Sequence, residues 1–333
     1  MRWSLGVQFA FCMAAFAFSE VCDARSVSVN SQTLIVVNKG ENTVSFIDLP
    51  SGREKSRVAT GPSPHEAALS PDGKSVAVAA YGGSTVDVFD VKSARLTARI
   101  DIDPNRALHG IAWIDTRKLV LAAEKSRSLV VVDVPKGTFE AIALGQPGTH
   151  MVALSPNRKI AYATNVAAGT ISVVDLFRLR KIKDIQVGGK PEGLAVSADG
   201  KRLWVGDNSA PKVRIVDIQS GEIVNMLSTD PVPIRVVGSP NGKMIVTSNI
   251  GAGTLSVFDA RTNVPLRSIV VSGMREAVQV TVAFAPDSSK VYVAETGADR
   301  VVEVDLVKGE VLRNIKTGKG GDGIAISSSD TKK

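Results

Sequence analysis

The sequence predicts an all-β fold, a seven-bladed β-propeller made of four-stranded antiparallel blades. Short runs of apolar and β-branched residues alternate with clusters of Gly, Pro, Asn and Asp, as strands alternate with turns. This pattern repeats along the chain with a period of roughly 40–45 residues, the length of one propeller blade. The first and last copies are each incomplete, and together they supply the strands of one blade. A single propeller domain therefore accounts for nearly all of the 333 residues.

Residues 160–201 contain one complete copy of the repeat. Apolar runs at Ile160–Ala163, Thr170–Val174 and Ile182–Val187 are separated by Gly, Asn and charged residues. A fourth run, Gly193–Ser197, ends in a Ser-Ala-Asp-Gly turn. Four short strands joined by such turns describe one antiparallel sheet. Because both faces of this sheet are apolar, it needs neighbouring copies to bury them.

An Asp that directly follows the third strand marks each copy. Successive marker residues are 42, 43, 42, 42, 42 and 46 positions apart. The seven markers are Asp48, Asp90, Asp133, Asp175, Asp217, Asp259 and Asp305. An Asp side chain accepts a backbone N–H two residues further on and so fixes a turn. We therefore expect a structural role for this series.

Two segments, Ala161–Asn165 (AYATN) and Val291–Glu295 (VYVAE), resemble the motif that names the YVTN family of propellers. Six of the seven copies also carry two apolar residues before the marker Asp, and the exception has Glu303. The resemblance extends from Leu34 to Ser327 and implies a closed ring of blades. This scaffold hosts many functions. The resemblance suggests two contexts, namely accessory proteins of periplasmic quinone-cofactor alcohol oxidation and relatives of the haem d1 propellers.

The strands appear in an order that predicts how the ring closes. After a polar lead-in with an optional edge strand at Val27–Asn30, the chain supplies second, third and fourth strands at Leu34–Val37, Thr43–Ile47 and Arg53–Ala59. The expected inner strands come later, at Glu66–Ser70, Gly110–Ile114, Met151–Ser155, Gly193–Ser197, Arg235–Ser239, Thr281–Ala285 and Gly323–Ser327. We expect the last of them to complete the N-terminal blade. Closure of this kind removes open sheet edges.

The N-terminus has the features of a bacterial secretory signal. Arg2 precedes an apolar run, Leu5–Phe18, that is too short to span a bilayer. Cleavage is expected after Ala17 or Ala24, and we favour Ala24 because that cut lies nearer the first strand. The predicted organisation is a signal peptide over residues 1–24 and one propeller over residues 25–333. The mature protein would be periplasmic, without a transmembrane segment.

Composition excludes several classes of function. Both cysteines, Cys12 and Cys22, leave with the signal, so no disulfide, thiolate metal site or Cys nucleophile is expected. The formal net charge of +7 comes from scattered residues, and the densest basic run, residues 178–183, suits a solvated sheet edge. Trp113 and Trp204 have apolar neighbours and are expected in the core. Because these tryptophans are not expected on a basic face and the Lys and Arg residues are scattered, the sequence gives no strong nucleic-acid signal.

The three histidines of the chain fall at one register of the repeat. They stand five positions before the end of the expected inner strands, on the loops that join one blade to the next. The seven residues at this register are His65, His109, His150, Glu192, Ile234, Val280 and Asp322. In blade order they form a polar arc that faces an apolar side at the mouth of the central channel. Such a composition is typical of a small-molecule or cofactor site.

The chemistry of this site remains open between three alternatives. First, His65, His109 and His150 could ligate a divalent transition metal in a lyase or hydrolase, with Glu192 as general base. Second, the propeller could be a binding or accessory protein. Third, each His could cap its strand in an interaction scaffold without a ligand, whose partner would be another periplasmic protein.

The binding alternative rests on basic residues near the same mouth. Arg106, Lys190 and Arg235, together with Asp322, would hold an anionic cofactor. The resemblance to the haem d1 propellers implies a tetrapyrrole, approached by channel-mouth histidines. The sequence does not decide whether the protein is an enzyme.

Overall fold

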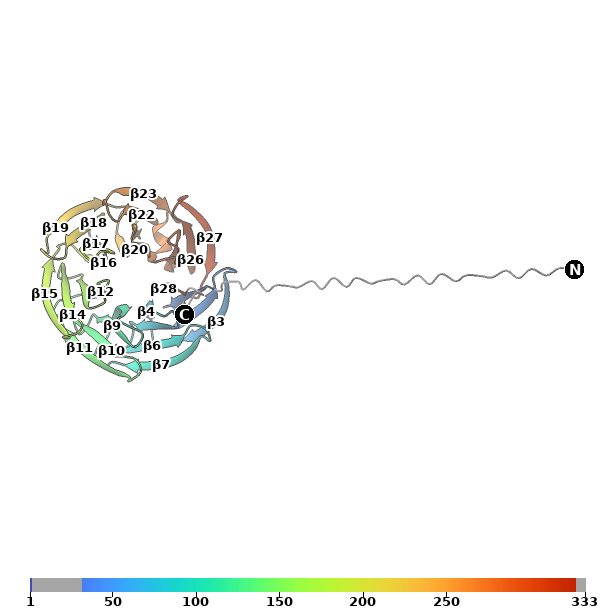
Figure 1. Cartoon of the computed structure of the whole chain (residues 1–333), viewed down its shortest axis with the longest axis horizontal. Helices are drawn as coiled ribbons and strands as arrows, with labels where there is room; N and C mark the ends of the chain where they lie inside the picture. Colours follow the sequence, from blue (N-terminus) through green and yellow to red (C-terminus); the bar gives the residue numbers. More distant parts are fainter. Residues whose placement is uncertain (2–31, 328–333) are drawn as a thin grey trace. The chain divides into compact units, whose positions relative to one another are not determined.

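The computed structural model describes Met1 and residues 32–327. Residues 32–327 form seven four-stranded antiparallel sheets arranged as the blades of one ring (Figure 1), which confirms the predicted fold. The expected signal peptide and the optional strand at Val27–Asn30 lie outside the described residues. No described helix is both long and apolar enough to cross a membrane.

The strands that surround the centre of the ring come from every blade (Figure 1). In the order of blades 1 to 7, the inner strands are β28 (Gly321–Ser327), β4 (Pro64–Leu69), β8 (Leu108–Trp113), β12 (Thr149–Leu154), β16 (Pro191–Val196), β20 (Pro233–Gly238) and β24 (Gln279–Phe284). The second strands are β1 (Thr33–Asn38), β5 (Ser75–Ala80), β9 (Lys118–Ala123), β13 (Ile160–Asn165), β17 (Arg202–Asp207), β21 (Met244–Asn249) and β25 (Lys290–Glu295). Each inner strand contacts the inner strands of both neighbouring blades, so together they line a central channel.

The third strand of each blade is largely buried, whereas the fourth, outermost strand is largely exposed. The third strands are β2 (Thr43–Asp48), β6 (Thr85–Asp90), β10 (Ser128–Asp133), β14 (Thr170–Asp175), β18 (Lys212–Asp217), β22 (Thr254–Asp259) and β26 (Arg300–Asp305). The fourth strands are β3 (Arg53–Ala59), β7 (Arg95–Asp101), β11 (Thr138–Ala143), β15 (Arg180–Gln186), β19 (Ile223–Ser228), β23 (Pro265–Val270) and β27 (Glu310–Lys316). Two short 3-10 helices, η1 (Arg275–Ala277) and η2 (Thr296–Ala298), lie in loops of blade 7.

The ring closes within blade 1, as predicted. Strand β28, from the C-terminal end of the described chain, pairs antiparallel with β1 and places Ile326 opposite Leu34 and Ala325 opposite Ile35. The sheet order β28-β1-β2-β3 therefore joins the two ends of the propeller. Hydrogen bonds between distant parts of the sequence hold the seam of the ring.

The inner strands begin two residues earlier than the sequence indicated. Strand β12, for example, begins at Thr149 instead of Met151. In all seven blades the pairing with the second strand shifts near the start of the inner strand, which carries one extra residue. Such a β-bulge interrupts the apolar–polar alternation of a strand. The register of the histidines was therefore wrongly expected on the loops and lies inside the strands.

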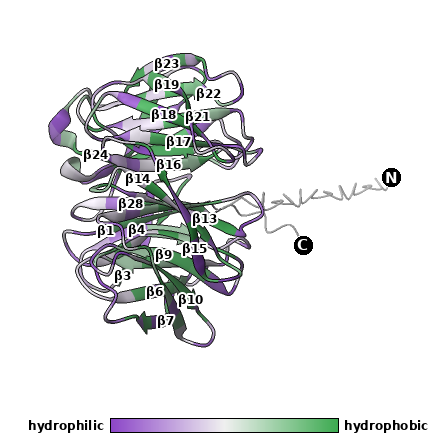
Figure 2. Cartoon of the chain, turned by 90° about the vertical axis from the view of Figure 1, so that its left-hand side faces the viewer, coloured by the Kyte–Doolittle hydropathy of each residue, from purple (hydrophilic) through white to green (hydrophobic). Residues whose placement is uncertain are grey.

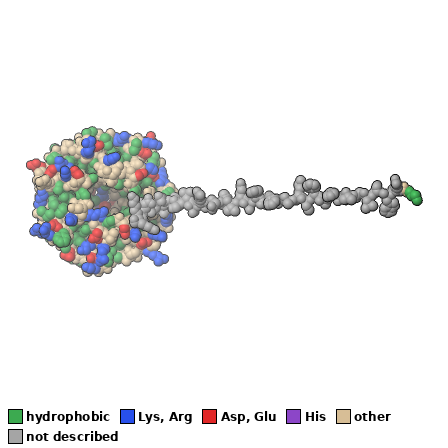
Figure 3. Space-filling model, in the orientation of Figure 1, with side chains coloured by type: hydrophobic (Ala, Val, Ile, Leu, Met, Phe, Trp, Pro, Cys, Tyr) green, Lys and Arg blue, Asp and Glu red, His purple; other side chains and the backbone are tan. Residues whose placement is uncertain are grey.

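Hydrophobic residues concentrate in the strands (Figure 2), and their buried side chains form clusters that join adjacent blades. Val86 and Val88 of β6, for example, pack against Leu119 and Leu121 of β9 in one buried cluster. Trp204 is fully buried and Trp113 nearly so, as expected. Figure 3 shows positive and negative side chains interspersed over the visible surface, in agreement with the scattered charge of the sequence.

The recurrent polar residues of the repeat stabilise turns and strand ends. Each of the seven marker Asp side chains accepts at least one backbone N–H of the turn that follows it, as predicted. The Asn that ends a second strand is also structural. Asn165 is fully buried and donates to the hydroxyls of Thr170 and Ser172 at 2.9 Å. Asn38 and Asn249 make the equivalent bonds in blades 1 and 6.

Candidate functional site at the channel mouth

The residues of the histidine register occupy the second position of every inner strand. His65, His109 and His150 thus lie one residue inside the start of β4, β8 and β12 in three successive blades. The bulge at this point re-aims side chains at the start of the strand. Several of the next residues are glycines, and at Gly110 a Cβ would lie 2.6 Å from the backbone nitrogen of Val152 in the next blade. Neighbouring inner strands therefore approach closely at the mouth.

The three imidazoles and one tyrosine form a continuous aromatic cluster. The rings of His109 and His150 stack with centroids 3.7 Å apart, and the His65 ring lies 5.3 Å from that of His109. Tyr81, directly after β5, lies 4.7 Å from His65 and edge-on to His109. The sequence brought the three histidines to one register, and the structure brings their rings together.

Carboxylates on both sides determine the charge of His150. Its Nδ1 lies 3.7 Å from Oε2 of Glu124, and its Nε2 lies 3.5 Å from Oε1 of Glu192. Burial alone would lower the pKa of His150, but the two carboxylates outweigh it and raise the pKa to about 9. His150 is therefore an imidazolium at neutral pH. The interaction with His150 in turn lowers the pKa of Glu124, whose Oε2 also accepts a hydrogen bond from the hydroxyl of Tyr81 at 3.2 Å.

His109, in contrast, is neutral at neutral pH. It is buried, and burial together with the positive charges of His150 and Arg235 lowers the pKa of His109 well below its usual value. Its Nδ1 has no hydrogen-bond partner within residues 32–327 and lies 3.8 Å from Oε1 of Glu66. A neutral imidazole with an unsatisfied nitrogen thus stacks on a charged one. A buried polar atom without a partner is rare and marks a position where a ligand group could bind.

An ion pair closes the channel below the histidines. The guanidinium of Arg235, in β20 of blade 6, lies 2.5 Å from Glu66 of blade 2. Because blades 6 and 2 are not neighbours in the ring, this pair spans the channel. Arg235 also contacts Sδ of Met151 at 2.8 Å and the hydroxyl of Thr281 at 3.2 Å. The histidine cluster therefore lies above a buried polar floor.

The predicted anion-binding residues do not form one basic cluster. Arg235 is buried against Glu66, and Arg106 pairs with Asp103 at 2.7 Å on the exposed rim. Lys190 is exposed and forms no ion pair with a described carboxylate. Asp322 is buried and pairs with Lys39 at 2.9 Å, with His65 Nε2 at 3.9 Å. Free positive charge is thus found at the rim and not at the floor of the mouth.

The described residues include no group of three or more His, Cys, Asp or Glu side chains arranged to hold a metal ion. His150 is already an imidazolium, so neither of its ring nitrogens offers a lone pair to a metal ion. Glu192, the expected general base, instead pairs with His150 and accepts a hydrogen bond from Asn208. The described side-chain arrangement therefore gives no support to the metal alternative, which stays a prediction.

The mouth contains a second register of residues that sequence reasoning missed. Lys39, Tyr81, Glu124 and Asn208 each directly follow a second strand, and each contacts a member of the histidine register. An alignment of the repeats on the residue after the second strand would have identified this series. Its members differ in chemical type, so no recurring residue type marks this register in the sequence.

Two family models each match part of the chain. The model of the YNCE-like β-propeller matches residues 4–131, and that of the cytochrome D1 heme domain matches residues 114–238. The second range includes His150, Glu192 and Arg235 of the mouth.

Two bacterial proteins have related sequences. Antigen Lp49 of Leptospira interrogans is 23% identical over 299 residues, which are 86% of this chain and 62% of the antigen. The uncharacterized protein YncE of Salmonella typhimurium is 36% identical over 81 residues, 24% of this chain and 23% of that protein. The match spans less than two thirds of the length of either relative.

Several solved structures have the same fold. A functionally unknown protein from Desulfotomaculum acetoxidans has a TM-score of 0.75 at 16% identity, over 90% of this chain and 99% of that one. Hydrazine synthase of Kuenenia stuttgartiensis has a TM-score of 0.68 at 20% identity, over 77% and 87%. The dihydro-heme d1 dehydrogenase NirN, in complex with DHE, has a TM-score of 0.65 at 15% identity, over 88% and 74%. The chain is thus a seven-bladed β-propeller similar to the YNCE-like propellers and to the cytochrome D1 heme domain.

Proposed function

We propose that this protein is a periplasmic binding or accessory protein that holds a planar conjugated cofactor, a carboxylate-bearing tetrapyrrole, at the channel mouth. The observation that carries the proposal is the cluster of His65, Tyr81, His109 and His150, in which buried His109 Nδ1 has no partner. A planar ring system would pack against such side chains, and one of its polar atoms would satisfy the free nitrogen.

The distribution of charge supports a ligand with its acidic groups at the edge. Inside the mouth, Glu66, Glu124, Glu192 and Asp322 already neutralise the nearby cations. A deeply placed carboxylate would meet these like charges. Exposed Lys190 at the rim is free to pair with a peripheral carboxylate, as the macrocycle of a tetrapyrrole would require.

The comparisons add independent support for this class of ligand. The cytochrome D1 heme domain model covers the part of the chain that supplies His150 and Glu192, and NirN, a protein of the same fold, was solved in complex with DHE. The bound macrocycle would supply redox chemistry and visible absorption, and the residues of this chain would orient it. Periplasmic location is proposed from the leader-like sequence at Arg2 and Leu5–Phe18.

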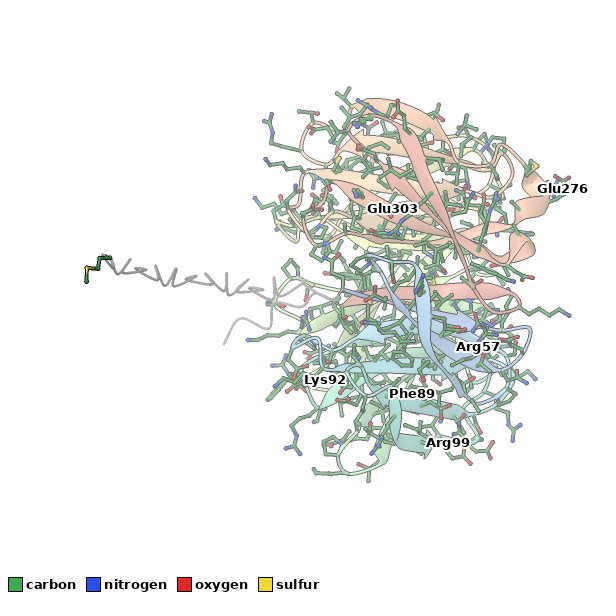
Figure 4. All side chains as sticks on the ribbon, turned by 90° about the vertical axis from the view of Figure 1, so that its right-hand side faces the viewer. Arg57, Phe89, Lys92, Arg99, Glu276 and Glu303 are labelled. Atoms are coloured by element: carbon green, nitrogen blue, oxygen red, sulfur yellow. The ribbon has the colours of Figure 1, made fainter. Side chains whose placement is uncertain are left out.

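The direct test is a titration with iron protoporphyrin IX, followed by its visible absorption. We expect saturable binding that His109→Ala weakens about tenfold or more, since His109 lies at the centre of the cluster. Lys92→Ala is the matched control, because Lys92 lies in a turn on the opposite face (Figure 4) and its loss should change nothing. Equal binding by His109→Ala and the control would refute the proposal, as would the absence of any saturable spectral change.

A second titration tests the rim. Lys190→Glu should weaken binding of iron protoporphyrin IX but leave binding of its dimethyl ester unchanged, because the ester carries no carboxylate. If both ligands respond equally, Lys190 does not recognise the acidic edge of the cofactor.

A further inference from the structure

A second concave surface lies on the opposite face of the propeller. An open cavity of about 490 Å³ is bordered by residues of blades 3 and 4, chiefly at 114–118, 133–140, 157–159 and 176–179. We call it the blade 3–4 groove. Its lining turns follow the inner and third strands, whereas the histidines begin the inner strands. Since strands run from one face to the other, the groove and the channel mouth are separate surfaces.

The groove carries an aromatic residue that the other blades lack. Phe177, two residues after marker Asp175, is 88% exposed. The residues at the same turn position of the other blades are Pro50, Lys92, Pro135, Gln219, Arg261 and Val307. An isolated exposed Phe beside a cavity lined by Phe139 and Leu176 extends the apolar surface. Such surface is typical of interaction sites.

The turn of blade 4 also adopts a conformation that its sequence disfavours. Leu179 has a φ of 50°, in the left-handed region. Four other blades place Gly at this turn position, namely Gly52, Gly137, Gly221 and Gly309. A bulky residue with positive φ is uncommon and strained. Leu179 lines the groove, so a residue in a strained conformation contributes part of the groove's apolar surface.

The rim of the groove has an excess of available positive charge. Lys118, Arg158 and Lys159 line it, and none forms an ion pair with a carboxylate in residues 32–327. The acidic side chain of Asp115 is engaged by its own turn, because it accepts the backbone N–H groups of Arg117 and Lys118 at 2.7 Å. Asp133 pairs with Lys136 at 3.5 Å. Glu140 also lines the groove and is exposed, so three cations and one carboxylate remain without an ion pair among the described residues, and the edge carries a net positive charge beside the apolar side chains.

We propose that the blade 3–4 groove docks a partner protein through an acidic segment bearing one bulky apolar side chain. The apolar side chain fills the cavity beside Phe177 and Leu179, and flanking carboxylates pair with Lys118 and Lys159. A concave site of this size accommodates a bulky side chain together with the peptide backbone beside it, whereas a flat bilayer could reach only its edge. Anchor side chains in pockets carry most of the affinity of such contacts, and the charges add steering and specificity.

The probe is a fluorescein-labelled peptide with the core Asp-Glu-Trp-Glu-Asp, measured by fluorescence anisotropy. Wild-type protein should bind it more tightly than peptides in which Gly replaces Trp or Lys replaces the acidic residues. Phe177→Ser and Lys159→Glu should each weaken binding by about fivefold or more. Val307→Ser is the matched control, because Val307 holds the equivalent position in blade 7 and is 71% exposed. It should bind like the wild type.

Two outcomes would overturn the proposal. One is that the acidic Trp peptide binds no better than its Gly counterpart, or equally to Phe177→Ser and Val307→Ser. The other is that the peptide fails to bind while anionic phosphatidylglycerol vesicles do, in a manner that requires Phe177, which would assign the surface to a membrane. Because Phe177 is exposed, Phe177→Ser should keep the wild-type melting temperature, so loss of binding cannot be attributed to unfolding.

Discussion

Single residues at the channel mouth obtain their charge from neighbouring blades. His150 of blade 4 lies between Glu124 of blade 3 and Glu192 of blade 5. The repeat alignment predicted that His150 and Glu192 share a register, because residues at one register are found by counting along the sequence. It could not predict the charged state of His150, since Glu124 belongs to the other register. The pairing of the two registers depends on the closing of the ring.

The charge of His150 predicts a specific dependence of stability on pH. The pKa of His150 is raised from 6.5 to about 9 in the folded protein. Its contribution to stability is therefore complete below pH 6.5 and lost as the pH rises through about 9. By linkage this contribution is at most about 3 kcal/mol. The wild-type melting temperature should thus fall between pH 6.5 and 9, and that of His150→Gln should fall much less.

His109 provides the control for this measurement. Burial lowers the pKa of His109 in the folded protein, so its protonation favours the unfolded state. His109 therefore reduces stability only as the pH falls below about 6.5. His109→Gln should therefore alter the acid side of the stability profile and leave the fall between pH 6.5 and 9 intact. The same alkaline fall in His150→Gln would show that another group causes it.

At the scale of the element, the inner strand combines a bulge with a glycine. The strands and their number followed from apolar runs and turn residues, which depend on local sequence. The starts of the inner strands did not, because the bulge places polar residues such as His65 and Asp322 inside a strand. The requirement for glycine at position 193 likewise comes from tertiary packing, since a Cβ there would lie 2.6 Å from the backbone nitrogen of Val236 in the next blade.

This close approach predicts that Gly193→Ala is more damaging than an ordinary Gly→Ala change. The new methyl group meets backbone atoms, which cannot rotate away, so overpacking should cost about 1–3 kcal/mol. Gly238→Ala, at the end of β20, is the matched control, because a Cβ there would only touch the Ile245 side chain at 3.5 Å. Its effect should stay within about 0.5 kcal/mol. Equal urea midpoints for the two variants would contradict the role given to Gly193.

At the scale of the whole molecule, ring closure was predicted by counting strands. The N-terminal repeat lacks an inner strand and the C-terminal repeat has only that strand, so the two parts complete each other. The ion pair of Arg235 with Glu66 was not predicted, because it joins residues 169 positions apart in non-adjacent blades. Period and strand order are readable from a repeat sequence, whereas contacts across the channel require the ring geometry.

Closure predicts that the last inner strand matters more than its seven residues suggest. A chain ending at Asp322 would lose most of β28, which pairs with β1 and packs between β24 and β4. It would leave the edge of β1 open, so both stability and solubility should fall. We expect the melting temperature to drop by roughly 10 °C, whereas a chain ending at Ser327 should match the full protein. A synthetic peptide of residues 321–327 should restore part of the loss by strand addition. If the shortened chain melts like the full protein, or the peptide has no effect, pairing of β28 with β1 does not hold the ring together.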